Sequence, residues 1–261
     1  MSLKFSSEEL FNFLLDEAQV HFSGWDFSYI SDREAQAPLS WSYVSEALLR
    51  VRKSQAVLDM DTGGGEMFSR FSPFPSIAYA TEAYPPNVPI ARERLEPLGV
   101  VVKQLEDEEE KQLPFEDDMF DLILNRHGYY WPPELYRILM PGGIFLTQQV
   151  GNRNDIGIRL LLGAPDDTVI EAWDDLAEAI EDLEQVGFRV LKHLEDIYPQ
   201  RFYDVGAMVY QLKAVPWQVL DFSVEGYLER LMAVHEQIQR DGYVDVNEHR
   251  FFIIAEKPVL P

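Results

Sequence analysis

One short segment has the residue types of a ligand-binding turn. It reads Val57-Leu58-Asp59-Met60-Asp61-Thr62-Gly63-Gly64-Gly65-Glu66, an apolar run followed by carboxylates and three glycines. We expect the apolar run to form a buried strand and a helix to begin after the glycines. Such a turn lets the backbone come close to a ligand, and a helix start offers free N–H groups. A plain tight turn would use the same glycines, so the segment alone does not identify a ligand.

Several other kinds of site are excluded by pattern. The dinucleotide pattern G-x-G-x-x-G fails because Phe68 stands at its third glycine, and no G-x-x-x-x-G-K-S/T loop occurs. A hydrolase with a serine nucleophile is unsupported because no G-x-S-x-G occurs. The chain has no cysteine and its histidines lack the spacing of metal ligands, so we predict no metal site.

The elements around the glycine segment alternate in type. Five short apolar runs lie at 56–60, 77–82, 100–102, 120–125 and 143–149. Runs of this length without polar alternation indicate strands buried on both faces, as in a parallel sheet. Segments between them, such as 91–98 and 133–140, have the length of helices. Alternating strands and helices predict an α/β fold with a doubly wound sheet.

Helices and strands are also expected on both flanks of this core. Residues 1–50 are predicted to be mostly helical, with a capped start at Ser6-Ser7-Glu8-Glu9 and a second helix over 40–51. Downstream we expect helices over 166–186, stopped by Gly187, and over 223–239, and strands over 188–194, 208–212 and 250–255.

The composition favours a single globular domain and disfavours nucleic acids and membranes as partners. The length of 261 residues, with 46% hydrophobic and 26% charged, suits one α/β domain with additions. The 22 basic and 45 acidic residues give a net charge of −23, which repels nucleic-acid phosphates and anionic membrane surfaces. No apolar run approaches the roughly 18 residues of a membrane span. The lack of cysteine fits a reducing compartment, so we expect a cytoplasmic protein.

Four motifs in order give the chain a family resemblance. Besides the glycine segment they are Thr81-Glu82-Ala83-Tyr84, the stretch from Leu113-Pro114-Phe115 to Phe120-Asp121, and the stretch from Glu134 to Pro141-Gly142-Gly143. The chain thereby resembles the class I S-adenosylmethionine-dependent methyltransferases, and in particular the type 11-like group. The resemblance implies a Rossmann-like fold with a mostly parallel, seven-stranded sheet whose last strand is antiparallel at the edge.

The resemblance also implies an organisation for the single domain 1–261. Residues 1–50 would form an N-terminal helical cap and 51–151 the cofactor-binding half. Residues 152–261 would form the C-terminal half, with the acidic helix and an insertion before the last strand.

The same resemblance implies a site for the cofactor S-adenosyl-L-methionine. Glu82 stands where a carboxylate accepts the ribose hydroxyls, although a solvent-facing acid at a strand end would look the same. Asp107 or Glu108 stands where the family places an acid near adenine, within an acidic run that also reads as a solvated surface. The complete expected set is Asp59, Asp61, Gly63, Gly65, Glu82, Asp107, Glu108 and Asn125.

Asp61 departs from the family pattern, which has a glycine at this position. Aspartate tolerates a positive φ better than most residues, and its charge would attract a sulfonium or an ammonium group. It could equally weaken or abolish cofactor binding. The second outcome would leave a methyltransferase fold without activity.

The acceptor side of the predicted site follows the fourth strand. His127 lies where the open-sheet rule places the ligand crevice, and it suits the role of a general base or a substrate-orienting group. A histidine bonded to nearby backbone is an equal alternative. Arg126, Tyr130, Trp131 and Gln148 are the predicted substrate residues, although packing and ion pairing would account for them as well.

These features predict a methyltransferase that acts on a small-molecule acceptor. One alternative is a non-catalytic or degenerate binding protein with the methyltransferase fold. The other is an RNA or protein methyltransferase, which the charge of −23 disfavours.

Overall fold

The computed structural model describes residues 6–22, 26–106, 112–154, 156–164 and 176–259, which cluster into two compact units. Unit 1 comprises Met1–Leu39, Asn152–Trp173 and Ile197–His249, and unit 2 comprises Ser40–Gly151, Asp174–Asp196 and Arg250–Pro261. The long strands β7 (Arg189–Phe202) and β8 (Val244–Glu256) contribute residues to both units.

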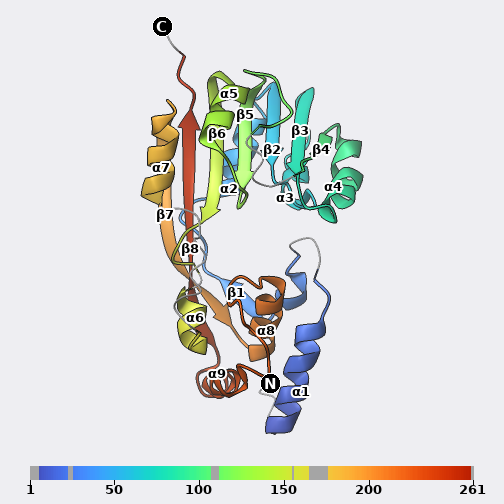
Figure 1. Cartoon of the computed structure of the whole chain (residues 1–261), viewed down its shortest axis with the longest axis vertical. Coiled ribbons are helices and arrows are strands. Elements are labelled where there is room, and N and C mark those ends of the chain that lie inside the picture. The colour runs from blue at the N-terminus through green and yellow to red at the C-terminus, as the bar shows by residue number, and fades with distance from the viewer. Residues whose placement is uncertain (1–5, 23–25, 107–111, 155, 165–175, 260–261) are drawn as a thin grey trace. The chain divides into compact units, whose positions relative to one another are not determined.

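Unit 2 contains the parallel sheet that the apolar runs predict. Its strands are β2 (Ala56–Met60), β3 (Ile77–Glu82), β4 (Val101–Gln104), β5 (Phe120–Arg126) and β6 (Leu139–Val150). They lie in the order β6-β5-β2-β3-β4, and each neighbouring pair is parallel (Figure 1). All five residues of β2 are buried, as expected for a central strand covered on both faces. The order reverses between β2 and β5, and this is where such sheets bind ligands.

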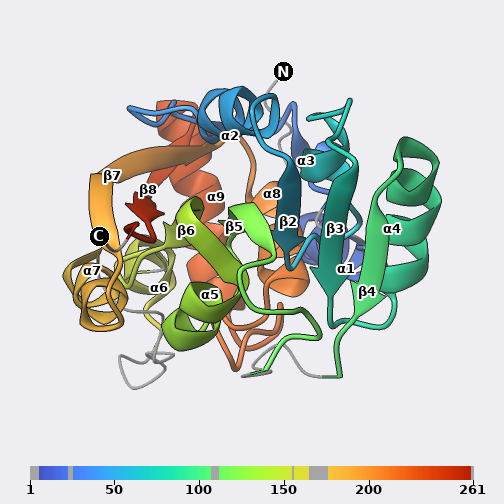
Figure 2. The ribbon, with the colours of Figure 1, turned by 90° about the horizontal axis from the view of Figure 1, so that it is seen from above.

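Helices cover this sheet as the alternating pattern predicts. They are α2 (Tyr43–Val51), α3 (Glu66–Ser69), α4 (Asn87–Leu95), α5 (Pro132–Ile138) and α7 (Leu176–Gln185), with the 3₁₀ turn η2 (Glu96–Leu98) after α4. Helices α2 and α5 lie on opposite faces of the parallel strands (Figure 2). Leu58, Ile123 and Phe145 from the sheet pack with Leu135 of α5 and Leu183 of α7 in one buried cluster. Gly187 follows α7 with a φ of 104°, as its predicted role as a stop requires.

Within the described residues the sheet has eight strands, so the expected number of seven is wrong. The full order is β1-β7-β8-β6-β5-β2-β3-β4, where β1 (Glu34–Gln36) pairs antiparallel with β7. Strand β8 is antiparallel to β6 as expected, but β7 and β1 lie beyond it, so it is not at the edge. The short polar segment 34–36 carries no apolar signal, and its pairing with β7 alone makes it a strand.

Unit 1 is built mainly from helices. They are α1 (Ser7–Gln19), the 3₁₀ turn η1 (Ser28–Ile30), α6 (Ile156–Leu162), α8 (Val205–Ala214) and α9 (Leu228–Asp241). Ser6 and Glu9 form the expected capping box at the start of α1. No helix in the described part of the chain is long and apolar enough to cross a bilayer.

The predicted strand over 208–212 is wrong, because these residues lie inside α8. Every residue from Val205 to Leu212 is buried, so the sequence is apolar on all sides of the helix. A short, uniformly apolar run is compatible with a buried strand or a buried helix, and periodicity cannot separate the two.

Candidate functional site

The glycine turn joins β2 to α3 within unit 2. The Thr62 N–H donates to the Thr81 carbonyl on β3 at 2.9 Å, and the Gly65 N–H donates to the Thr62 carbonyl at 3.0 Å. Gly65 has a φ of 78°, and a Cβ added there would lie 2.8 Å from Cγ of Leu95 on α4. Glycine at this position therefore permits both the left-handed backbone and the close approach of α4.

Asp61 has a left-handed backbone conformation. Its φ is 53°, and its N–H faces the Thr81 hydroxyl at 3.4 Å. The Asp61 side chain lies directly against the backbone of Gly128, where an added Cβ would come within 2.5 Å of the Asp61 Cβ. The aspartate is thus accommodated by a glycine on the loop after β5.

Two buried carboxylates end the neighbouring strands β2 and β3. Asp59 is 7% exposed and Glu82 is 5% exposed, and one Glu82 oxygen accepts the Tyr84 N–H at 2.8 Å. Burial raises the pKa of Asp59 to about 7, Thr62 and Arg126 oppose the rise, and the negative charge of Glu82 adds to it. The ends of these strands therefore form a region of negative electrostatic potential that would favour the binding of a cation.

Tyr43 of α2 brings a phenol to the same region. The residue is 5% exposed, and among the described groups none makes a hydrogen bond with its hydroxyl. Burial and the nearby charge of Asp59 raise the pKa of Tyr43 well above its ordinary value, although Arg126 opposes the shift. A buried hydroxyl without a partner is costly, and a bound ligand with a polar group would relieve that cost.

Asn125 lies at the centre of a buried polar network. Its Oδ1 accepts hydrogen bonds from the Thr147 hydroxyl at 3.1 Å and from the Gln149 amide at 2.5 Å. The Gln149 amide also donates to the Gly128 carbonyl at 3.0 Å, and Asn125 Nδ2 lies 3.5 Å from the Tyr129 carbonyl. Asn125 and Gln149 therefore fix the loop that holds Gly128 against Asp61.

His127 is exposed on the same loop and has a φ of 64°. Its N–H donates to the Gln148 carbonyl at 2.9 Å, and its Nε2 lies 3.0 Å from Nε2 of Gln148. The Gln148 Oε1 accepts the indole N–H of Trp41 at 2.9 Å. Although the residue as a whole is exposed, neighbouring groups desolvate its imidazole ring. This desolvation, together with the positive charges of Arg126 and Arg250, lowers the pKa of His127 well below its ordinary value.

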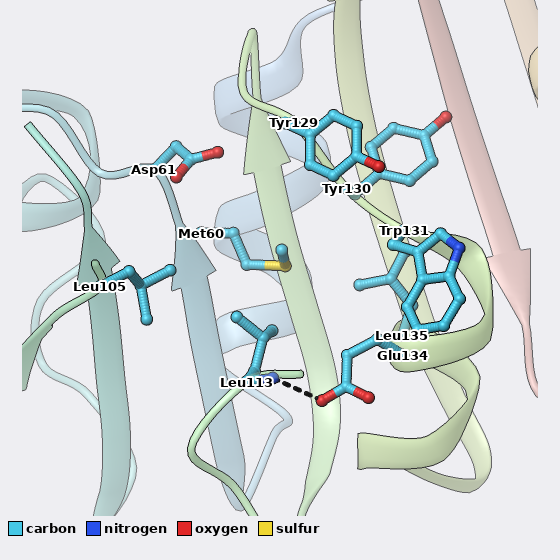
Figure 3. Close-up of a pocket in the computed structure, with 9 residues that line it drawn as sticks. All are labelled: Met60, Asp61, Leu105, Leu113, Tyr129, Tyr130, Trp131, Glu134 and Leu135. Carbon is cyan, nitrogen blue, oxygen red and sulfur yellow. Dashed lines mark hydrogen bonds between the residues drawn. The ribbon is translucent and has the colours of Figure 1, made fainter. Parts of the chain in front are cut away.

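Aromatic residues line a narrow pocket at the carboxyl ends of β2 and β5 (Figure 3). Figure 3 shows Asp61 and Tyr129 at one end and Leu113 and Glu134 at the other. The complete lining is Met60, Asp61, Leu105, Leu113, Tyr129, Tyr130, Trp131, Glu134 and Leu135.

Tyr130 and Trp131 differ in what they offer to a ligand. Tyr130 is 8% exposed, and its ring packs edge-on against Phe145 at 5.0 Å between centroids. Trp131 is half-buried and precedes α5 at its N-cap position. Tyr130 thus belongs to the core as well as to the pocket wall, whereas Trp131 keeps an accessible surface.

The buried carboxylate of Glu134 holds the floor of this pocket. It accepts the Leu113 N–H at 2.7 Å and the Nε–H of Arg137 at 2.8 Å. Arg137 in turn donates to the carbonyls of Leu113 and Phe115 and to the carboxylate of Asp117. This clamp explains why the Leu113-Pro114-Phe115 motif and the motif that begins at Glu134 occur together.

The structure gathers most of the predicted site residues at one end of the sheet. Asp107 and Glu108 lie outside the described residues. Sequence reasoning missed Trp41, Tyr43 and Gly128, which carry no motif. Asp61 was the only sequence signal for Gly128. The Asp61 side chain needs space on the loop that faces it, and a glycine on that loop provides the space.

Comparisons with known proteins agree with this fold. Residues 58–147 match a family model described as a methyltransferase domain. A proposed methyltransferase from Bacillus halodurans superposes with a TM-score of 0.57 at 20% identity, covering 82% of this chain and all 100% of that chain. No curated protein matches the sequence.

Two further solved structures share the fold at lower identity. A proposed sarcosine dimethylglycine methyltransferase from Galdieria sulphuraria has a TM-score of 0.52 at 16% identity and covers 83% of this chain and 84% of its own. The SpnF cyclase has a TM-score of 0.52 at 16% identity, covering 98% and 97% respectively. Residues 58–147 of this chain therefore match a methyltransferase domain, and the sheet that contains them shares the fold of these solved structures.

Proposed function

We propose that the protein is an S-adenosylmethionine-dependent methyltransferase that acts on a small-molecule acceptor in the cytoplasm. The observation that carries the proposal is the pair of buried carboxylates, Asp59 and Glu82, which ends neighbouring strands beside the glycine turn. The net charge of −23 supports a small acceptor over a nucleic acid, and the lack of cysteine supports a reducing compartment.

The residues present fit the cofactor in charge and hydrogen bonding. S-adenosylmethionine carries a sulfonium, an ammonium and two ribose hydroxyls, and it supplies a methyl group bonded to positively charged sulfur. Glu82 would accept the ribose hydroxyls, and Asp59 and Asp61 would lie near the cationic groups. A polar group of the cofactor would give the buried hydroxyl of Tyr43 a hydrogen-bond partner. Gly63, Gly65 and Asn125 would shape the turn and the loop around the cofactor, and Asp107 and Glu108 are proposed only from the family resemblance.

The acceptor would be held by the loop after β5. His127 and Arg126 are exposed there and would orient its polar groups, while Trp131 and Tyr130 would wall it and Gln148 would support His127. Methyl transfer depends chiefly on alignment of the acceptor with the methyl group.

Calorimetric titration with S-adenosylmethionine tests the cofactor assignment. We expect wild-type binding in the micromolar range and a loss of at least about tenfold in Glu82→Gln, which keeps the size of the side chain but removes its charge. Glu66→Gln is the matched control, because Glu66 begins α3 directly after the glycine turn and has an exposed side chain paired to Arg94. An equal loss in both variants would assign the effect to the turn rather than to a ribose contact.

The degenerate alternative has its own outcome in this experiment. Its supporting observation is Asp61, whose side chain fills the position of the usual glycine with a φ of 53°. If the wild type does not bind S-adenosylmethionine and Asp61→Gly does, the chain is a methyltransferase fold that has lost its cofactor. If neither binds, the cofactor assignment itself is wrong.

A further inference from the structure

Trp41 and Gln148 form a hydrogen-bonded pair whose direction is fixed. The indole N–H of tryptophan can only donate, so the Gln148 atom 2.9 Å from it must be the amide oxygen. Trp41 is 8% exposed and Gln148 is 4% exposed, and the Trp41 ring packs 5.9 Å from the ring of Phe252 on β8. The hydrogen bond and the burial of both side chains therefore fix the orientation of the amide.

The fixed orientation of the Gln148 amide determines which ring nitrogen of His127 carries the proton. With its oxygen toward Trp41, Gln148 presents its NH₂ group to the Nε2 of His127 at 3.0 Å. An amide NH₂ only donates, so Nε2 must be the unprotonated ring nitrogen. The ring proton of the neutral imidazole then resides on Nδ1. The His127 N–H bond to the Gln148 carbonyl at 2.9 Å holds the backbone of the histidine in the same register.

The charged groups around the ring favour this neutral state. Arg126 precedes His127 on β5, and Arg250 on β8 lies opposite Val150, two residues beyond Gln148 on β6. Both cations oppose a third positive charge on the imidazole, and so does desolvation, which is why the pKa of His127 falls. Asp59 is the acidic group whose charge also acts near Arg126.

We propose that Trp41 and Gln148 are positioning residues that hold His127 as a neutral donor through Nδ1–H, and that this donor with Arg126 and Arg250 receives an anionic oxygen of the methyl acceptor. Every group in this set donates and none accepts a hydrogen bond. The charges of two arginines act on one histidine here, in a chain with only 22 basic residues against 45 acidic ones. The set therefore discriminates in favour of carboxylate-bearing acceptors. The assignment of the ligand as a methyl acceptor rests on the proposed function, whereas the state of His127 does not.

Nitrogen NMR of histidine-labelled wild-type protein tests the state of the ring without any cofactor. We expect at neutral pH a protonated-type signal for Nδ1 of His127 and an unprotonated-type signal for Nε2. Assignment comes from the loss of both signals in His127→Asn. A protonated Nε2, or a ring that is charged at neutral pH, would overturn the proposal directly, even if every variant below failed to fold.

Two variants separate positioning from simple packing. Gln148→Glu places a carboxylate acceptor at Nε2, so we expect the proton to move to that nitrogen and the ring to become easier to charge. Trp41→Phe keeps the aromatic contact with Phe252 but frees the amide, so we expect a mixture of the two neutral forms. Trp217→Phe, an exposed tryptophan of unit 1, should leave the His127 signals unchanged. An unchanged ring in Gln148→Glu would remove the positioning role.

The class of acceptor is tested with benzoate, benzamide and benzylammonium as probes. We expect benzoate alone to shift the Nδ1 signal of His127 to saturation, and Arg126→Gln to weaken that binding by about tenfold. The exposed His193 on β7 serves as the reference that should not respond. Preference for benzylammonium, or no response to any probe, would refute the anionic acceptor. Failure of S-adenosylmethionine to bind would refute the proposed function and leave these signals as they are, so the two failures are distinguishable.

Discussion

The burial of Asp59 makes the stability of the folded protein depend on pH. Its pKa in the folded protein is about 7, against an ordinary value of 3.8, so the folded state binds a proton that the unfolded chain has released. The stability of the wild type therefore falls as pH rises from about 4 to about 7, and above pH 7 the whole penalty is present. At roughly 1.4 kcal/mol per pKa unit, the penalty is on the order of 4 kcal/mol.

Asp59→Asn should remove this penalty. We expect the variant to be more stable than the wild type above pH 7, by roughly 1–4 kcal/mol, with an advantage that shrinks as the pH falls toward 4. Urea unfolding at several pH values measures it. Asp121→Asn is an unsuitable control because Asp121 accepts backbone N–H bonds from Gln55 and Ala56. Asp182→Asn, at an exposed position of α7, is suitable, and an equal pH dependence in both variants would contradict the prediction.

Tyr43 gives a second prediction, in which stability and binding move in opposite directions. Its buried hydroxyl lacks a partner among the described groups, so Tyr43→Phe should raise the free energy of unfolding by about 1 kcal/mol. The same change should weaken S-adenosylmethionine if the cofactor uses that hydroxyl. Chemical unfolding and calorimetry on one preparation measure both quantities. Tyr79→Phe, on the neighbouring strand β3, controls for the loss of a phenol elsewhere in the sheet.

The sequence predicted the site unevenly, and the reason is physical. Asp59, Glu82 and the glycines follow apolar runs, so their place at strand ends can be derived from the chain. The direction in which a side chain bonds cannot be derived in this way. Gln148 appeared as a substrate residue on the rim, yet it is 4% exposed and bonds Trp41 and His127. Tyr43 and Trp41 come from the other end of the chain, and only the folded sheet brings them to His127 and Asp59.

Two loops meet where Asp61 lies against Gly128, and this contact predicts a double-mutant cycle. Gly128→Ala alone should cost several kcal/mol or displace a loop, because its Cβ would come within 2.5 Å of the Asp61 Cβ. Asp61→Gly alone should stabilise the protein by roughly 1 kcal/mol, since it relieves a left-handed residue.

The combination of these two changes is the informative measurement. In the Asp61→Gly background the alanine at 128 has space, so its cost should fall to less than about 1 kcal/mol. Thermal unfolding of the four proteins gives the coupling energy. Additive effects would mean that the clash at Gly128 involves the backbone and not the Asp61 side chain.

The clamp between α5 and the segment before β5 gives another prediction at this scale. Arg137→Met removes the donors to the Leu113 and Phe115 carbonyls and leaves the Glu134 carboxylate, which is 5% exposed, without its cation. We expect a loss of roughly 1–3 kcal/mol, because the carboxylate left behind is buried while the guanidinium is partly exposed and solvent screens the pair. Arg189→Met breaks the exposed pair with Glu256 and should cost less than about 1 kcal/mol. Similar losses in urea unfolding would show that burial does not set the strength of the clamp.

The elements that the sequence predicted share a property that the others lack. The parallel strands of unit 2 are short apolar runs between helices, and the burial of the central strands β2 and β5 follows from that pattern. Strand β1 has no such pattern, since it is a three-residue polar segment that becomes a strand only through pairing with β7. Helix α8 is apolar along its whole buried length, so its sequence does not show the helical period that would distinguish it from a strand.

At the scale of the whole molecule, the net charge of −23 opposes folding through repulsion among acids. Ion pairs within the described residues act in the opposite sense, but several are exposed, such as Arg240 with Asp241 and Arg92 with Glu96. Exposed pairs contribute about 0–1 kcal/mol each, so salt has little stabilisation to remove from them. Repulsion extends over all the acidic residues and decays only with the screening length.

The balance predicts the direction of the salt effect. Raising the ionic strength from about 0.01 M to 0.15 M shortens the screening length from about 30 Å to 8 Å, which weakens repulsion between separated acids more than it weakens close pairs. We therefore expect the midpoint of thermal unfolding to rise by several degrees with sodium chloride. Sucrose at equal osmolality is the control, because it stabilises a protein by its exclusion from the protein surface and does not screen charges. A midpoint that falls with salt would mean that close ion pairs, and not the surplus of acids, dominate the electrostatic free energy of this protein.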